Sequence, residues 1–231
     1  MTRRLAPRAH PAAAPERIPD WTNRFFHNDD PSGAGFHGLA LGRDHGYTNA
    51  DINVNACKAG KVLQLLLGLV GVLINTHWID TGHDHWRSAA VKGNVKLRTL
   101  TWPQVRKLRS PGGFRIRRIN QIIRRAAKLG YTHLELELKD GVDWLPHKVL
   151  VALIRSAERV AAAVGIEIYW KTLSDIGNPL KRVKAVHAAG GVAVLLPRDH
   201  PHLSADEWWP HLDYFRGDPD DITWTHAKKA A

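Results

Sequence analysis

Short apolar stretches alternate with longer amphipathic stretches along most of the 231-residue chain. The short stretches are rich in β-branched and aromatic residues and are bounded by glycine, proline or polar residues, which is the pattern of β-strands. Eight segments have this character, at residues 24–27, 47–54, 71–77, 132–139, 166–171, 192–197, 212–217 and 222–226. Most of the connections between them are long enough for a helix, so the pattern predicts alternating strands and helices.

Two of the connecting segments have clear helical periodicity. In residues 118–130 the apolar positions recur at helical spacing, with basic side chains opposite them. The apolar positions are Ile119, Ile122, Ile123, Ala126 and Leu129. Residues 146–165 repeat the scheme, with proline suited to the first turn and glycine to the end. We expect two amphipathic helices, each packed by one face against a sheet.

Strands that alternate with helices pair in parallel through crossover connections. Eight such strands suggest a closed (β/α)8 TIM barrel, and a doubly wound open sheet is the alternative. The chain length fits one domain of this kind, which we place at residues 21–231. Residues 1–20 mix Arg, Ala and Pro without an apolar centre, and we interpret them as a flexible basic amino-terminal arm.

Composition restricts the chemistry and the setting of the protein. The net charge of +11 favours acidic partners or substrates, such as phosphates or nucleic acid. Cys57 is the one cysteine, which excludes an internal disulfide and a cysteine-based zinc cluster. The most apolar stretch, residues 62–74, is too short to cross a bilayer. We therefore expect a cytoplasmic protein without stable membrane insertion, in which carboxylates, amides and imidazoles build any metal site.

Polar and ionisable side chains gather at the carboxyl ends of the predicted strands. In a barrel these ends meet at one face, where the active sites of this fold lie. In chain order they are His27, Asp51, Asn53, His77, Glu137, Lys139, Lys171, Arg198, Arg216 and His226. Within this set the imidazoles of His27 and His77, three oxygen ligands and several cations suit metal-assisted attack on a phosphodiester. The metal neutralises phosphate charge, one imidazole takes a proton and the other gives one.

Two short stretches allow more than one interpretation. His83 and His85 could hold a transition metal together with Asp80 or His77, but a glycine at position 82 favours an irregular loop with solvated histidines. In residues 134–138 leucine and glutamate alternate, so both glutamates face the same way. They point into the barrel, where burial requires a compensating cation, or they form the outer face of an edge strand.

The order of these residues resembles that of the glycerophosphodiester phosphodiesterase family of TIM barrels. His27 stands where the family has its first histidine, Asp51-Ile52-Asn53 where it has Glu-x-Asp, and His77 where its second histidine follows an apolar strand. Residues 95–139 are similar to the stretch between the family's third and fourth strands. They end in Glu137-Leu138-Lys139, where the family has Glu-x-Lys.

The resemblance implies a metal-dependent phosphoric diester hydrolase that acts on glycerophosphodiesters derived from lipids or teichoic acids. It implies acid and base roles for His27 and His77, a Mg²⁺ or Ca²⁺ held by Asp51, Asn53 and Glu137, and substrate contacts from Lys139 and Lys171. In the family the glycerol 2-hydroxyl attacks the phosphate and a cyclic phosphate is then hydrolysed. The expected partner is therefore a small or polymeric phosphodiester.

The chain departs from the family pattern at three positions. Asn28 follows the first histidine where the family has Arg-Gly, Asn53 replaces an aspartate, and Trp78 follows the second histidine where aspartate is usual. Fewer anionic ligands weaken the binding of a hard cation. Two alternatives therefore stay open: a catalytically decayed member that only binds, and a basic nucleic-acid-binding protein without enzymatic activity.

Overall fold

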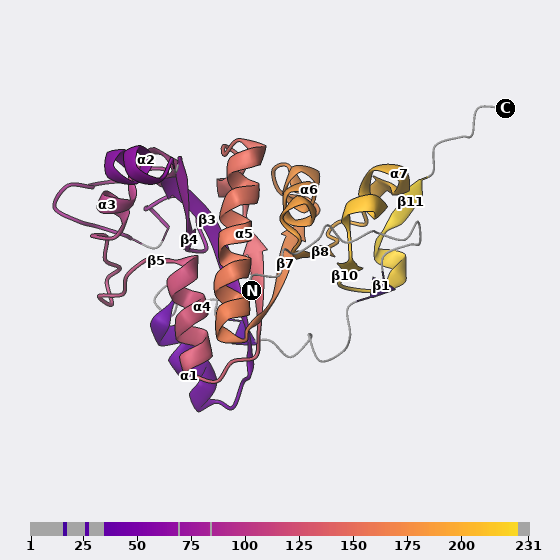
Figure 1. Ribbon diagram of the computed structural model, residues 1–231, viewed down its shortest axis with the longest axis horizontal. Helices are drawn as coiled ribbons and strands as arrows, with labels where there is room; N and C mark the ends of the chain where they lie inside the picture. Colours follow the sequence, from indigo (N-terminus) through magenta and orange to yellow (C-terminus); the bar gives the residue numbers. More distant parts are fainter. Residues whose placement is uncertain (1–15, 18–25, 28–34, 69, 84, 226–231) are drawn as a thin grey trace.

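The structure is a computed structural model in which residues 16–17, 26–27, 35–68, 70–83 and 85–225 are described (Figure 1). Within these residues a nine-stranded sheet forms the centre of the molecule. Its strand order is β1-β10-β8-β7-β6-β3-β4-β5, and β2 pairs with β3 as well. A small second sheet pairs β11 with β9.

The strands and helices alternate from β6 to β8, as the sequence predicts, and β9 then follows β8 without a helix between them. The main sheet contains β1 (Glu16–Arg17), β2 (Phe26–His27), β3 (Asn49–Lys58), β4 (Gly71–Asn75), β5 (Arg117–Arg118), β6 (His133–Leu138), β7 (Glu167–Leu173), β8 (Val192–Leu196) and β10 (Tyr214–Phe215). The small sheet contains β9 (His202–Ser204) and β11 (Thr223–Thr225). The α-helices are α1 (Phe36–Asp44), α2 (Lys61–Leu67), α3 (Trp102–Val105), α4 (Ile119–Lys128), α5 (His147–Val164), α6 (Pro179–Ala189) and α7 (Ala205–Trp208). Short 3-10 turns are η2 (Leu97–Thr99), η3 (Asp140–Val142), η4 (Trp209–His211) and η5 (Pro219–Asp221).

Parallel pairing dominates the main sheet. It joins β1 to β10, β10 to β8, β8 to β7, β7 to β6, β6 to β3 and β3 to β2. This confirms an α/β fold with a central parallel sheet. The pairings among the described strands run from β1 to β5 without closing a ring, so the closed (β/α)8 barrel stays a prediction.

The expectation of uniform parallel pairing is wrong for β4, which runs antiparallel to β3. The connection between these strands contains α2, and its ends are joined by a hydrogen bond from Ala59 N to Val70 O of 3.1 Å. The chain therefore turns back beside the strand that it has just left. The strand β5 then pairs antiparallel with β4 at the edge of the sheet.

The last predicted strand, residues 222–226, also differs from expectation. Its described part is β11, which pairs with β9 and not with the main sheet. After β10 the turn η5 redirects the chain, and the Asp218 side chain begins this turn by accepting a hydrogen bond from Asp220 N at 3.2 Å. His226, expected at the mouth of the barrel, lies outside the described residues.

The apolar core lies between the sheet and the helices α4, α5 and α6, which run side by side along it (Figure 1). The predicted apolar stripe of residues 118–130 is confirmed, since Ile119, Ile122 and Ile123 in α4 are fully buried. Leu134 and Leu136 of β6 are buried in the same core. Leucines of β6 therefore face the helices, and the alternating glutamates face the opposite side of the sheet.

Two residues inside the predicted amino-terminal arm, Glu16 and Arg17, form β1 and pair with Tyr214 and Phe215 of β10. The rest of the arm lies outside the described residues, and its boundary stays a prediction. In the described part of the chain, no helix combines the length and the apolar composition that crossing a membrane requires.

Candidate functional site

The register of three neighbouring parallel strands places polar side chains in two rows on the sheet face opposite the helices. One row is Asp51, Glu135 and Tyr169, and the next is Asn53, Glu137 and Lys171. Register partners in a parallel sheet point to the same face, and so do residues two apart along a strand. The rows thus bring together, by backbone geometry alone, three acids and one lysine from three strands that are far apart in the sequence.

Lys171 lies at the centre of this group. Its ammonium forms ion pairs with Asp51 Oδ2 and, at 2.8 Å, with Glu137 Oε2, and it lies 3.9 Å from Glu135 Oε2. The Lys171 side chain is 3% exposed. Burial opposes the charged form, but Asp51, Glu135 and Glu137 outweigh it and hold the pKa of Lys171 above its ordinary value. The lysine is therefore charged at every physiological pH.

Glu137 connects this buried group with the surface. Its Oε2 pairs with Lys171, and its Oε1 pairs with the ammonium of Lys139, which is half-buried beyond the end of β6. Burial acts to raise the pKa of Glu137, but Lys171 and then Lys139 lower it below its ordinary value. Glu137 is therefore a carboxylate at neutral pH. Because Glu137 is fixed by Lys171 on one side, it can hold the ammonium of Lys139 in place on the other.

Glu135 is the most deeply buried acid of the group, with no exposed surface. Arg216, beyond β10, donates to Glu135 Oε2 at 2.6 Å. Burial nevertheless raises the pKa of Glu135 to about 7, with a further contribution from the Asp51 charge, against the lowering by Lys171 and Arg216. The prediction that both glutamates of β6 share one buried face, opposite the helices, is confirmed, and a barrel interior at that face stays a prediction. The alternative of an edge strand is wrong, because β6 lies between β3 and β7.

A cavity of about 460 Å³ opens beyond the carboxyl ends of these strands, and we call it the His77 cavity. Its lining includes His77, Trp78, Glu137, Lys139 and Arg198. This volume falls in the range of small-molecule sites, and the lining offers one imidazole, one indole, two cations and two carboxylates, those of Glu137 and Asp140. Three of the predicted site residues, His77, Glu137 and Lys139, therefore share one cavity.

The imidazole of His77 is positioned from β3. The Asn53 amide lies 3.4 Å from His77 Nδ1, at hydrogen-bond distance, and the Trp78 ring lies beside the imidazole with centroids 4.8 Å apart. Asn55 holds the backbone around His77, because its Nδ2 donates to Thr76 O at 2.8 Å and to Trp78 O at 3.3 Å. The contact at Nδ1 sets the orientation of the His77 imidazole.

Strand pairing and burial place three of the remaining predicted residues. The backbone of His27 pairs with Asp51 in the parallel register, which places β2 beside the first row of acids. Asp51 and Lys171 are buried beneath the cavity. Lys171 is thus enclosed by acids, whereas the sequence predicted a contact with substrate.

The loop after His77 brings two of the predicted transition-metal ligands together, but no group of three such ligands forms among the described residues. His83 Nδ1 lies 3.1 Å from Asp80 Oδ1, and the His83 ring stacks on Trp78 with centroids 4.2 Å apart. The alternative of a solvated loop fits the exposed rings of His83 and His85. Trp78 is thereby fixed between two imidazoles at the rim of the His77 cavity.

Two sets of contacts that the sequence did not reveal shape the far wall of the cavity. Arg182 of α6 is completely buried, donates to Leu138 O at 2.6 Å and to Ile176 O, and pairs with Asp143 Oδ1 at 3.3 Å. It therefore ties the end of β6 to the loop after β7. Arg198 is anchored through its backbone, since Arg198 N donates to Ser174 Oγ at 2.8 Å. The spacing of these residues gave no signal, because the contacts depend on the order of strands in the sheet.

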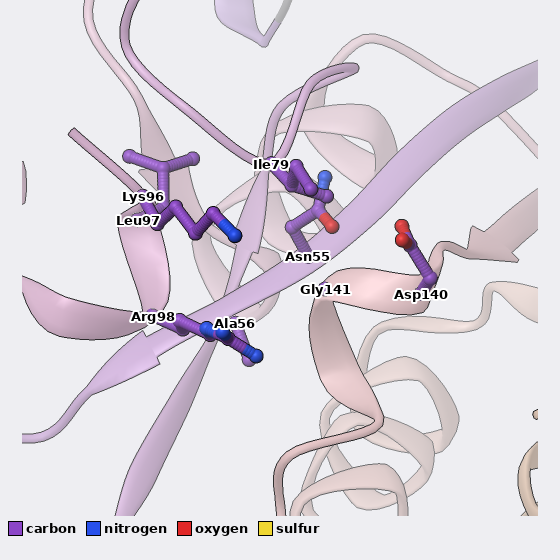
Figure 2. Close-up of a pocket in the computed structure, with 8 residues that line it drawn as sticks. All are labelled: Asn55, Ala56, Ile79, Lys96, Leu97, Arg98, Asp140 and Gly141. Carbon is purple, nitrogen blue, oxygen red and sulfur yellow. The ribbon is translucent and has the colours of Figure 1, made fainter. Parts of the chain in front are cut away.

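A second, smaller cavity of about 190 Å³ adjoins the first, and we call it the Lys96 cavity. Ile79 and Asp140 line both cavities. Figure 2 shows Lys96 and Arg98 on one side of the Lys96 cavity and Asp140 on the other, with β3 passing between them. The two cavities together form a surface with cations at both ends.

The predicted divalent metal does not fit the residues around Lys171. Asn53 supplies an amide in place of a carboxylate, and the ammonium of Lys171 occupies the point on which Asp51, Glu135 and Glu137 converge. Among the residues described, no group of three or more histidine, cysteine, aspartate or glutamate side chains has an arrangement able to hold a metal ion. A divalent cation about 4 Å from the ammonium would be repelled by roughly 8 kcal/mol, which is twice the value for two unit charges near a protein surface.

The comparisons with known proteins place the chain by its fold. No protein-family model matches the chain, and no curated protein matches its sequence. Its structure is similar to that of a glycerophosphodiester phosphodiesterase from Parabacteroides distasonis ATCC 8503, with a TM-score of 0.50. The two chains are 13% identical, and the similarity covers 88% of this chain and 90% of the other. At this identity the relationship is one of fold, so the reaction has to be argued from the site.

Proposed function

We propose that this protein binds a phosphodiester in the His77 cavity and hydrolyses it by acid–base catalysis. The observation that carries the proposal is the convergence of His77, Lys139 and Arg198 on one cavity at the carboxyl ends of parallel strands. Ligands of α/β folds bind at this end of the sheet. The fold similarity to a glycerophosphodiester phosphodiesterase supports a phosphodiester as the substrate class.

The two cations of the cavity are suited to the phosphate. Lys139 is held by Glu137 at the floor, and Arg198 lies on the exposed rim. A phosphodiester carries one negative charge in the ground state and gains charge as the nucleophile adds. Fixed cations next to these oxygens stabilise the charge that develops, so Lys139 and Arg198 lower the barrier more than they tighten substrate binding.

His77 is suited to move the proton. As a base, its Nε2 takes the proton of an attacking hydroxyl, which belongs either to the substrate alcohol or to water. The new P–O bond forms while the bond to the leaving oxygen breaks, and that oxygen receives a proton from an acid. His27 is our proposal for this acid, on the basis of its strand beside Asp51. Asn53 keeps the His77 ring oriented during the exchange.

A second function, binding without turnover, is favoured by one observation. The residues that resemble a metal site include Asn53, and Lys171 is already paired with the acids. If turnover in this fold required a divalent cation, the same cavity would be a phosphodiester-binding site alone. The two functions predict the same ligand and differ in whether a product forms.

The experiment that tests the proposal is a kinetic comparison with glycerophosphocholine and bis(p-nitrophenyl) phosphate. We expect His77→Ala to reduce kcat by about 100- to 10,000-fold, the usual contribution of a general acid or base. Lys139→Gln should reduce kcat/KM, because the fixed charge at the phosphate is lost. The matched control is His147→Ala, which removes an exposed histidine at the start of α5.

Three outcomes separate the alternatives. Turnover that His77→Ala reduces by about 100-fold or more and His147→Ala preserves supports hydrolysis in this cavity. Saturable binding of glycerophosphocholine by calorimetry, without product from folded protein, supports the binding function. Neither binding nor turnover would refute both functions for these ligands.

A further inference from the structure

The acids beneath the His77 cavity surround a lysine in the way that acids in proteins surround a metal ion. Asp51 and Glu137 contact the Lys171 ammonium directly, and Glu135 Oε2 lies 3.9 Å from it. The oxygens come from two strands, β3 and β6, and the lysine comes from a third, β7. With 3% of its side chain exposed, Lys171 is enclosed by the protein and does not line the cavity.

The charges of this group balance without any added ion. Asp51, Glu135 and Glu137 carry at most three negative charges. Lys171 contacts all three, Arg216 pairs with Glu135 at 2.6 Å, and Lys139 pairs with Glu137. Three positive charges therefore face at most three negative charges. A divalent cation placed here would add two uncompensated charges to a buried region, which is costly unless a cation leaves.

The position of Lys171 also determines what lines the cavity. Its pair with Glu137 Oε2 fixes that carboxylate, and Glu137 Oε1 in turn receives the Lys139 ammonium. Glu137 and Lys139 both line the His77 cavity. Lys171 is therefore a positioning residue, which acts on the substrate through Glu137 and Lys139.

We infer that the Lys171 ammonium takes the place of a divalent cation in this site, so that the His77 cavity binds and acts on its phosphodiester without a metal. The inference rests on the proposed function for its role, but the occupancy of the cation position is a separate property of the protein. The ammonium is attached to the chain, so the positive charge is present whatever the metal concentration. Divalent cations then compete with a lysine that cannot diffuse away.

The first test is a titration of the full-length protein with Ca²⁺, Mg²⁺ and Mn²⁺. Calorimetry measures Ca²⁺ and Mg²⁺, and electron paramagnetic resonance measures free Mn²⁺. We expect no saturable site up to about 1 mM, the weak end of calcium affinities in proteins. A saturable site with one ion per chain, lost in Asp51→Asn, would overturn the inference.

The second test removes the ammonium and leaves the acids. In Lys171→Ala we expect a lower unfolding temperature in EDTA and a rise of several degrees on adding Ca²⁺ or Mn²⁺, because the freed carboxylates now accept the ion. The wild-type protein should show no such rise. The control is Lys148→Ala, which removes an exposed lysine on α5 and should behave as wild type.

The outcomes distinguish this inference from the proposed function. If Lys171→Ala folds and its unfolding temperature does not change with any of the cations, the idea that the lysine occupies a cation site is refuted. If Lys171→Ala does not fold, the wild-type titration decides the question alone. A wild-type protein that binds no metal and has no turnover would support the placement of Lys171 in the cation position and refute hydrolysis. A wild-type protein that binds a metal and is active would refute that placement and support hydrolysis.

Discussion

Replacing Glu135 by glutamine should remove a pH dependence of stability that the wild-type protein shows between about pH 4.5 and 7. Glu135 is completely buried, and burial raises its pKa to about 7 from an ordinary value of 4.5. In this interval the folded protein keeps the proton that the unfolded chain has released. The free energy of unfolding therefore falls as the pH rises, and the loss is complete above pH 7.

The magnitude follows from the two pKa values. Each tenfold difference in proton affinity corresponds to 1.36 kcal/mol, so a difference from 4.5 to about 7 amounts to about 3 kcal/mol. The contribution is fully present below pH 4.5, where both states are protonated. Glutamine has no proton to release, so Glu135→Gln lacks this contribution. Its unfolding free energy should then change over the interval only through the titrating groups that it shares with wild type.

The assay is urea unfolding of wild type and variant at pH 5, 6, 7 and 8, with the difference between the two proteins as the readout. The control is Glu207→Gln, which removes an exposed glutamate in α7. We expect the control to follow wild type at every pH. If wild type and Glu135→Gln lose stability in parallel from pH 5 to pH 8, the assignment of a buried, largely protonated Glu135 is refuted.

Three further predictions concern the walls of the cavities. Gly141→Ala should destabilise the protein by about 1–3 kcal/mol in urea unfolding, because the new Cβ would clash with the buried Asn55 Oδ1; an unchanged midpoint would contradict the packing described here. His77→Ala should keep the free energy of unfolding within about 1 kcal/mol of wild type while reducing kcat by about 100-fold or more, since the half-buried imidazole has a chemical role and not a packing role. Lys96→Ala combined with Arg98→Ala should raise KM for a polyglycerophosphate and leave KM for glycerophosphocholine unchanged, because these cations line only the adjoining cavity; equal effects on both substrates would argue against one continuous surface.

Local periodicity was enough to predict the elements that are buried along one face. The alternation of leucine and glutamate in residues 134–138 predicted that one face of β6 is apolar and the other acidic, and the buried leucines confirm this. The apolar stripe of α4 was equally clear. Both patterns arise because a single neighbouring layer, the core, determines which side of the element is buried.

The arrangement of the strands was beyond local reasoning. That β4 turns back along β3 depends on how the connection after Lys58 folds, and the apolar composition of β4 fits either direction. The role of Lys171 depends on β7 lying beside β6 and β6 beside β3. From the sequence alone, a lysine at the end of a strand is expected to contact the substrate. The register of Lys171 with Glu137 shows instead that it lies beside the buried acids.

The central claim is that this cavity hydrolyses a phosphodiester with the protein's own cations. The most direct measurement is a ³¹P NMR time course of glycerophosphocholine with metal-stripped, folded protein in EDTA, beside His77→Ala under the same conditions. We predict that the diester signal is replaced by a product phosphate signal with wild type and persists with His77→Ala. A diester signal that persists with wild type in EDTA but disappears on adding Mg²⁺ or Ca²⁺ would contradict the claim.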